Sequence, residues 1–156
     1  MVVGDASIDI DLLVIGAGPG GYVAAIRAAQ LGQNVIIADK AYWGGVCLNV
    51  GCIPSKALIN AAHRYEQAKN GAEFGISAGD VRVDFGRVQS YRASVVNRMT
   101  SGVESLLKAN KVQLFRGEAM FINETEVRLF NEQESPRYRF KNCIVATGSR
   151  PIELKA

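Results

Sequence analysis

A glycine-rich segment that directly follows an apolar strand constrains this chain more than any other feature. Residues 9–15 read as a strand that is wholly apolar over 12–15, which is typical of a strand buried on both faces of a parallel sheet. The sequence GAGPGG follows at once over 16–21, and the alanine-rich residues 22–31 favour a helix. A second strand is indicated over 34–39. This order predicts a βαβ unit whose helix begins at a glycine loop.

The glycine loop fits the binding of a phosphate, because the N–H groups of a helix's first turn point toward such a ligand. Gly16 permits the tight turn, Gly18 lets a pyrophosphate approach the backbone, and Gly21 allows the helix to pack closely on the strand. Asp39 closes the second strand, where a carboxylate can accept hydrogen bonds from ribose hydroxyls. We expect an adenine dinucleotide here, either FAD or NAD. The negative charge of Asp39 disfavours the 2′-phosphate of NADP, and a tight turn without a ligand is the alternative.

Two further helices are expected. The first covers residues 54–69 and is followed by a glycine-containing loop over 71–79. Asp84 can cap the second, which reaches Asn110. Apolar residues recur along this second helix at steps of three and four, which predicts a face buried in the core, with a partner interface as the alternative. They are Val88, Tyr91, Val95, Met99, Val103 and Leu106 or Leu107.

The last third of the chain predicts short strands. Four of them, at residues 112–116, 119–122, 126–130 and 138–140, are separated by turn-forming residues and predict a small antiparallel meander. A final strand over 143–146 leads into the sequence TGSRP. We therefore expect one α/β domain over residues 1–156, a Rossmann-like FAD/NAD(P)-binding fold with a parallel sheet, helices and the meander.

Two cysteines, Cys47 and Cys52, lie in the sequence GGVCLNVGCIPSK. In a straight helix their positions would differ in height by about 7.5 Å and face different sides, so a bridge between them requires looped backbone. Gly44, Gly45 and Gly51 permit such a loop. A redox-active pair is the favoured interpretation, because a structural disulfide is uncommon in a cytoplasmic protein.

Zinc is the other common use of paired cysteines, and it requires four ligands. Beyond the pair, Cys143 and the single histidine, His63, offer little to complete such a set. We therefore predict no metal site. Cys143 is expected to be a small apolar residue of a buried strand, and His63 a surface or packed residue.

The position of Cys52 favours its thiolate form. Pro54 suits the first turn of a helix, so Cys52 is expected near the positive end of that helix. Lys56 can share its face. Both effects lower the pKa of a thiol.

Composition excludes several other functions. The chain has 156 residues, 48% of them hydrophobic and 21% charged, which is typical of a folded domain. Its net charge of +3 comes without a basic run, so no nucleic-acid partner is expected. No apolar run approaches the length of a membrane span, and the beginning, MVVGDASIDID, lacks the basic residues of a targeting peptide. A cytoplasmic protein is expected.

The glycine loop followed by GGVCLNVGCIPSK resembles the flavoprotein disulfide reductases, over about residues 10–151. Within that family the sequence CLNVGCIPSKAL is most similar to that of the members that oxidise dihydrolipoyl groups. The resemblance implies bound FAD, with its pyrophosphate over Gly16, Gly18 and Gly21 and its adenosine ribose on Asp39. The further FAD contacts that it implies are Lys40, Gly45, Val46, Lys56, Ala119, Thr147, Gly148 and Ser149.

The resemblance also implies a reaction. Cys47 would be the thiol that meets the dihydrolipoyl substrate, Cys52 the thiol nearest the flavin, and Lys56 would meet the flavin's reactive edge. NAD would accept the electrons, and the partner would be a dihydrolipoyl domain of a 2-oxoacid dehydrogenase complex or glycine cleavage system. Family members are homodimers with NAD-binding, central and interface domains that this sequence does not contain, so we expect residues 1–156 alone to be inactive or nearly so. The alternatives are another disulfide reductase and a non-catalytic FAD-binding module.

Overall fold

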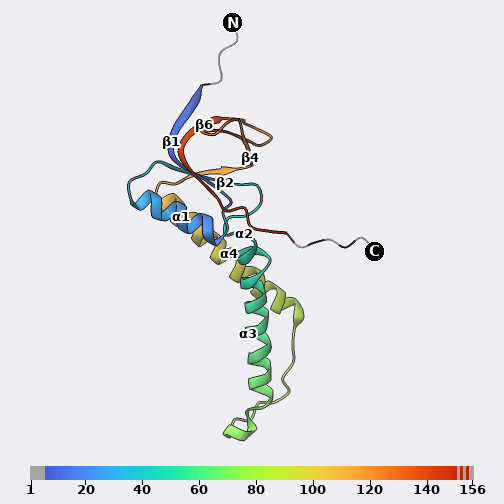
Figure 1. Cartoon of the computed structure of the whole chain (residues 1–156). Helices are drawn as coiled ribbons and strands as arrows, with labels where there is room; N and C mark the ends of the chain where they lie inside the picture. Colours follow the sequence, from blue (N-terminus) through green and yellow to red (C-terminus); the bar gives the residue numbers. More distant parts are fainter. Residues whose placement is uncertain (1–5, 151, 153, 155–156) are drawn as a thin grey trace. The chain divides into compact units, whose positions relative to one another are not determined.

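The computed structural model describes residues 6–150, 152 and 154 (Figure 1). These residues divide into two compact units, one made of the described residues up to Gly45 and from Gly102 onward, the other of Val46–Ser101. The elements follow one another as β1 (Ser7–Ile15), α1 (Pro19–Gln30), β2 (Val35–Asp39), α2 (Gly45–Asn49), α3 (Cys52–Lys69), the 3-10 helix η1 (Gly71–Phe74), α4 (Phe85–Ala109), β3 (Gln113–Arg116), β4 (Glu118–Phe121), β5 (Glu126–Phe130) and β6 (Arg137–Val145).

A six-stranded sheet forms the centre of the first unit, in the order β3-β2-β1-β6-β5-β4. Strand β1 is parallel to both β2 and β6, and β2 is parallel to β3. Strands β4, β5 and β6 pair antiparallel. Figure 1 shows β1 in blue and β6 in red side by side. The predicted α/β class, a parallel sheet with a βαβ unit and an antiparallel meander, is confirmed.

The core of this sheet forms where the sequence is continuously apolar. Leu13, Val14 and Ile37 have no exposed surface, as expected for central strands of a parallel sheet. The core continues into the meander through Val127 and Leu129, which are also fully buried. Burial of such side chains contributes about 1.5–3 kcal/mol each, so the sheet is the most strongly stabilised part of this unit.

Two strand predictions are wrong in detail. The segment expected over 112–116 forms β3, which joins the parallel part of the sheet beside β2 instead of the meander. The segments expected over 138–140 and 143–146 are one continuous strand, β6, in which Asn142 pairs with Leu12 of β1 and Lys141 forms an ion pair with Asp11. Strand β6 therefore pairs parallel with β1 on one side and antiparallel with β5 on the other.

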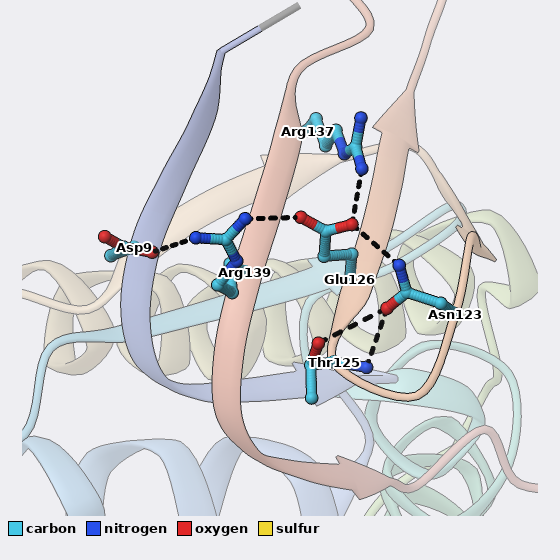
Figure 2. Close-up of polar contacts among 6 residues, drawn as sticks. All are labelled: Asp9, Asn123, Thr125, Glu126, Arg137 and Arg139. Atoms are coloured by element: carbon cyan, nitrogen blue, oxygen red, sulfur yellow. Dashed lines mark hydrogen bonds and ion pairs between the residues drawn. The ribbon is translucent and has the colours of Figure 1, made fainter.

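The buried carboxylate of Glu126 joins strands β5 and β6 of the meander (Figure 2). Glu126 of β5 is 4% exposed and accepts hydrogen bonds from Arg137 and Arg139, both on β6, the second at 3.0 Å. Asn123, in the turn before β5, donates to the same carboxylate at 2.7 Å. These donors, the Arg137 guanidinium first, hold the pKa of Glu126 at about 2, below its ordinary value of 4.5.

The second unit contains most of α2, all of α3 and η1, and the first part of α4. Helix α4 begins directly after Asp84, whose Oδ1 accepts the backbone N–H of Arg87 at 3.1 Å, so the predicted cap is confirmed. Among the described residues, no helix is both long and apolar enough to cross a lipid bilayer.

The prediction that the apolar face of α4 lies in the core is wrong for most of its length. Only Val103 and Leu107, near the end of the helix, are buried. Tyr91, Met99 and Leu106 are 44%, 43% and 54% exposed. Periodicity identifies the apolar face of a helix, but it does not say what covers that face.

Candidate functional site

The glycine loop lies between the end of β1 and the start of α1, and packing requires glycine at two of its positions. Gly16 has a φ of +102°, and a Cβ there would overlap the carbonyl oxygen of Ala146, which follows β6. A Cβ on Gly21 would overlap the carbonyl oxygen of Gly16. Helix α1 can therefore lie this close to the loop only because both residues lack a side chain.

Gly18 differs, because the fold itself leaves room for a side chain at this position. A Cβ there would lie 4.0 Å from the Cα of Gly45, which is an ordinary contact. Gly18 is the N-cap of α1, Pro19 opens the first turn, and in the described structure neither a side-chain cap nor an acidic residue occupies that turn. An uncapped helix start without a neighbouring side chain is what a phosphate group requires.

The connection from β2 to α2 lies directly on the glycine loop. The N–H of Gly44 donates to the carbonyl oxygen of Ala17 at 2.8 Å, and the N–H of Ala17 donates to Oδ2 of Asp39 at 2.7 Å. Gly45 has a φ of +60°, and a Cβ there would lie 2.5 Å from the Cα of Gly18. The glycine loop is therefore held by residues from the end of β2 onward, a feature that the sequence did not reveal.

Asp39 lies at the end of β2, as predicted, and its carboxylate is already engaged with the backbone. Oδ1 accepts the N–H groups of Ala41 at 2.7 Å and Tyr42 at 3.0 Å, and Oδ2 accepts that of Ala17. Each carboxylate oxygen can accept two hydrogen bonds. Oδ2 therefore has capacity for one ribose hydroxyl in addition to Ala17, and the ribose contact stays a prediction.

The segment after β6 also reaches the glycine loop. The N–H of Ala146 donates to the carbonyl oxygen of Ile15 at 2.7 Å. The backbone nitrogen of Thr147 lies 3.0 Å from where a Cβ of Gly16 would be. Thr147, Gly148 and Ser149 are exposed. The fold thus brings the second predicted FAD segment beside the first.

Lys40 and Ala119 lie close to Asp39 along the same sheet. The ammonium of Lys40 is 3.4 Å from Oε1 of Glu118, the residue before Ala119. The N–H of Gly117 donates to the carbonyl oxygen of Asp39 at 3.1 Å. Ala119 pairs with Leu129 in β4, an edge strand of the sheet. The residues predicted to hold the adenosine end of FAD therefore belong to one neighbourhood of the first unit.

The cysteine pair belongs to the second unit. Cys47 is half-buried in α2, Cys52 is the exposed first residue of α3, and both are thiols in this structure. The Cys47 thiol donates a hydrogen bond to the sulfur of Cys52 and accepts one from the N–H of Cys52. A looped backbone joins the two helices, and in it the N–H of Gly51 donates to the carbonyl oxygen of Val46 at 2.8 Å. Because the two sulfurs are in contact, the pair fits a redox-active disulfide.

The two thiols have different electrostatic surroundings. The hydrogen bond to Cys52 and partial burial raise the pKa of Cys47, and the positive charge of Lys56 opposes this rise. Lys56 is exposed in the first turns of α3. The charge of Lys56 thus acts on Cys47. The thiolate form of Cys52, and the roles of Val46 and Lys56 toward FAD, stay predictions.

The residues that were given no role have ordinary surroundings. Cys143 packs against the core of the sheet, and burial raises its pKa. His63 is exposed on α3. In the described ranges 6–150, 152 and 154, no three or more His, Cys, Asp or Glu side chains gather as a metal ion would require.

A glycine loop at the start of a helix and a hydrogen-bonded pair of thiols are both features of the class of dinucleotide-dependent disulfide oxidoreductases. The chain belongs to the pyridine nucleotide-disulphide oxidoreductase family, whose model matches residues 10–156. It is 64% identical over 154 residues to a dihydrolipoyl dehydrogenase of Bacillus subtilis, 63% identical to one of Geobacillus stearothermophilus and 57% identical to one of Staphylococcus aureus. Each match covers 99% of this chain and 33% of the relative, so the chain spans about a third of the length of these curated proteins.

The fold has a counterpart among solved structures. The Cu(II) complex of the HOCl-induced flavoprotein disulfide reductase RclA from Escherichia coli matches with a TM-score of 0.78 at 23% sequence identity. The match covers 94% of this chain and 30% of that one. This likeness supports the fold alone.

Proposed function

We propose that the chain is the FAD-binding and redox-disulfide part of a dihydrolipoyl dehydrogenase. The contact between the Cys47 and Cys52 thiols within GGVCLNVGCIPSK carries the proposal, because a transient disulfide needs both sulfurs in reach of each other. The identities of 57–64% to dihydrolipoyl dehydrogenases support dihydrolipoyl as the substrate rather than another disulfide. In this proposal residues 1–156 form one FAD-binding portion, and other segments of the enzyme supply the NAD-binding, central and interface domains.

The chain's own residues perform the first half of the reaction by thiol–disulfide exchange. A thiolate of the dihydrolipoyl group attacks Sγ of Cys47 in the Cys47–Cys52 disulfide, the S–S bond breaks, and Cys52 leaves as a thiolate. The second substrate thiol, as a thiolate, displaces Cys47 from the mixed disulfide and closes the cyclic lipoyl disulfide. Two electrons pass from the substrate to the cysteines. Of the two substrate protons one is released and the other remains on Cys47, whose raised pKa favours the thiol.

The first unit fits FAD on three observations. Helix α1 starts without a side-chain cap, the fold leaves the space above Gly18 open to a phosphate, and Oδ2 of Asp39 can accept a further hydrogen bond. Lys40, Gly45, Ala119, Thr147, Gly148 and Ser149 would complete this site within the first unit. That Val46 and Lys56 also contact FAD is implied by the family resemblance alone. The chemistry that FAD supplies when bound is two-electron transfer from the dithiol to NAD⁺, which no side chain can perform.

The same proposal includes the partners that the family implies. These are the dihydrolipoyl domain of a 2-oxoacid dehydrogenase complex or a glycine cleavage protein, a second copy of the complete enzyme, and NAD⁺ as the electron acceptor in the cytoplasm. The second candidate function is a non-catalytic FAD-binding module, in which the glycine loop of the first unit binds FAD and the cysteine pair takes no part. Reduction of the bound flavin by dihydrolipoamide distinguishes the two, because a non-catalytic module binds FAD without passing electrons to it from the substrate.

An absorbance titration tests the proposal directly. FAD is added to the purified chain, the unbound flavin is removed, and the spectrum is recorded before and after anaerobic reduction with one equivalent of dihydrolipoamide. We expect bound flavin and a long-wavelength band on reduction, from a thiolate beside the flavin. The Cys52→Ser variant should bind FAD and lack this band, whereas Cys143→Ser should behave as wild type. A wild-type chain that binds FAD and shows no reaction with dihydrolipoamide would contradict the disulfide part of the proposal.

A further inference from the structure

Arg116 contacts the connection between β2 and α2 in two ways at once. It is the last residue of β3 and lies beside Asp39 of β2 in the parallel register. Its Nη1 donates to the carbonyl oxygen of Ala41. The guanidinium carbon lies 4.7 Å from the centroid of the Trp43 ring, which is a cation–π distance. Asn131 donates to the carbonyl oxygen of Arg116 at 3.0 Å and fixes the end of β3.

The segment that Arg116 holds is the one that lies on the glycine loop. Trp43 is 8% exposed, so its ring is packed and not free to swing away. The next two residues make the contacts to the loop: Gly44 donates to Ala17, and Gly45 meets Gly18. Residues 41–45 therefore contact both Arg116 and the glycine loop, all within the first unit.

We propose that Arg116 is a positioning residue for the dinucleotide, which holds residues 41–45 against the glycine loop and thereby sets the affinity of that loop for FAD. The inference rests on the proposed function, which supplies FAD as the ligand. Arginine suits the task better than lysine, because a planar guanidinium can stack on an indole and donate to a carbonyl oxygen at the same time. Arg116 acts through Ala41 and Trp43, and it is not among the predicted FAD contacts.

The single tryptophan of the chain makes the test specific. Acrylamide quenching of tryptophan emission reports Trp43 alone, and titration with FAD reports the affinity of the same sample. In Arg116→Gln we expect faster quenching of Trp43 and a Kd for FAD that rises about tenfold, the expected effect of losing one cation–π contact and one charged hydrogen bond. Arg116→Lys should lie between this variant and wild type. Arg128→Gln is the matched control, because it removes a guanidinium of the same sheet that donates to Ser135 instead of the loop.

A double-variant cycle adds a second readout. Trp43→Leu removes the indole that the Arg116 guanidinium contacts. The Kd for FAD of the double variant Arg116→Gln/Trp43→Leu should therefore be no higher than that of whichever single variant binds FAD more weakly. If wild type binds FAD, two results would overturn the inference. One is an unchanged Kd in Arg116→Gln, and the other is a loss of affinity in the double variant that equals the sum of the losses in the single variants. A wild-type chain that binds no FAD contradicts the proposed function, and the inference falls with it. Because wild type alone shows whether FAD binds, a failure of the proposed function can be distinguished from a failure of the inference about Arg116.

Discussion

At the scale of single residues, the raised pKa of Cys47 gives the cysteine pair a measurable asymmetry. The first cause of the rise is the hydrogen bond to Cys52, and burial adds to it. In Cys52→Ala that hydrogen bond is lost, so the pKa of Cys47 should fall and its thiolate fraction at neutral pH should increase. We expect faster alkylation of Cys47 by iodoacetamide in Cys52→Ala than in reduced wild type, measured by peptide mass spectrometry across pH.

Cys143 is the internal control for this experiment. It is partly buried and far along the chain, on β6, so its alkylation rate should be the same in both proteins. An unchanged rate at Cys47 would mean that burial, rather than the hydrogen bond to Cys52, sets its pKa.

Glu126 predicts how stability depends on pH. Its carboxyl has a pKa of about 2 in the folded protein and an ordinary value of 4.5, so between these values the unfolded chain binds more protons. The contribution of Glu126 is therefore complete above about pH 4.5 and is lost as the pH falls toward 2. Urea denaturation should show Glu126→Gln to be less stable than wild type at pH 7, with a difference that shrinks below pH 4.5.

A carboxylate in an exposed pair provides the comparison. Glu104 forms an i,i+4 pair with Lys108 on α4, and the two side chains are 38% and 63% exposed, against 6% for the side chain of Glu126. Glu104→Gln should change stability at pH 7 by less than about 0.5 kcal/mol. A loss in Glu126→Gln that is equal at pH 7 and pH 3 would mean that the ionised carboxylate is not what stabilises the meander.

Asp39 shows what a sequence can predict about a site and what it cannot. A carboxylate at the end of β2, after a glycine loop, could be recognised from spacing alone. Its hydrogen bonds to the N–H groups of Ala17, Ala41 and Tyr42 depend on how the following segment folds back, and no periodicity records this. For the same reason Arg116 and Trp43 carry no motif that would have drawn attention to them.

At the scale of elements, the contact between α1 and β1 distinguishes two neighbouring glycines. A Cβ on Gly21 would overlap the carbonyl oxygen of Gly16, whereas a Cβ on Gly20 would meet nothing within 4 Å in the described structure. Gly21→Ala should therefore destabilise the fold by about 1–3 kcal/mol and weaken FAD binding. Gly20→Ala should be neutral, or stabilise by up to about 1 kcal/mol, because alanine is the better helix former.

Chemical denaturation and FAD titration of the two variants check this prediction. Both variants add one methyl group to the first turn of the same helix, so a difference between them reports packing and not helix propensity. Equal stabilities would show that α1 can shift away from β1 at little cost.

The strands show why some elements could be predicted and others could not. The central strands were recognisable because their burial on both faces requires an unbroken apolar run. Strand β3 is only four residues long, Gln113–Arg116, and a short segment does not reveal whether its neighbour is parallel or antiparallel. The sequence of β6 indicates two segments because Lys141 and Asn142 are polar and both are exposed. Exposed polar residues do not end the strand, because its pairing with β1 continues from Asn142 to Val145.

At the scale of the whole molecule, the two units differ in how their helices are covered. Helix α1, with 12 residues, buries Gly21, Ala25 and Ala28 on one side. Helix α3 has 18 residues and buries only Pro54 and Ala57, both in its first turns. The apolar face of α4 is likewise exposed at Tyr91 and Met99. Tertiary packing, which sequence periodicity does not describe, therefore distinguishes helices whose intrinsic propensities are similar.

This difference predicts that α1 is locally more stable than α3, whereas helix length alone would predict the opposite order. An isolated helix gains stability with length, so α3 would be the more persistent of the two if packing did not matter. Because packing does matter, the amides of residues 61–69 should exchange with deuterium at least about 100-fold faster than those of α1, and those of β1 should be the slowest. Hydrogen exchange followed by mass spectrometry of peptides from α1, α3 and β1 measures all three rates in one sample. Exchange in α3 as slow as in α1 would contradict the prediction. If dilution of the sample then restored fast exchange, self-association would be what protects the second half of α3.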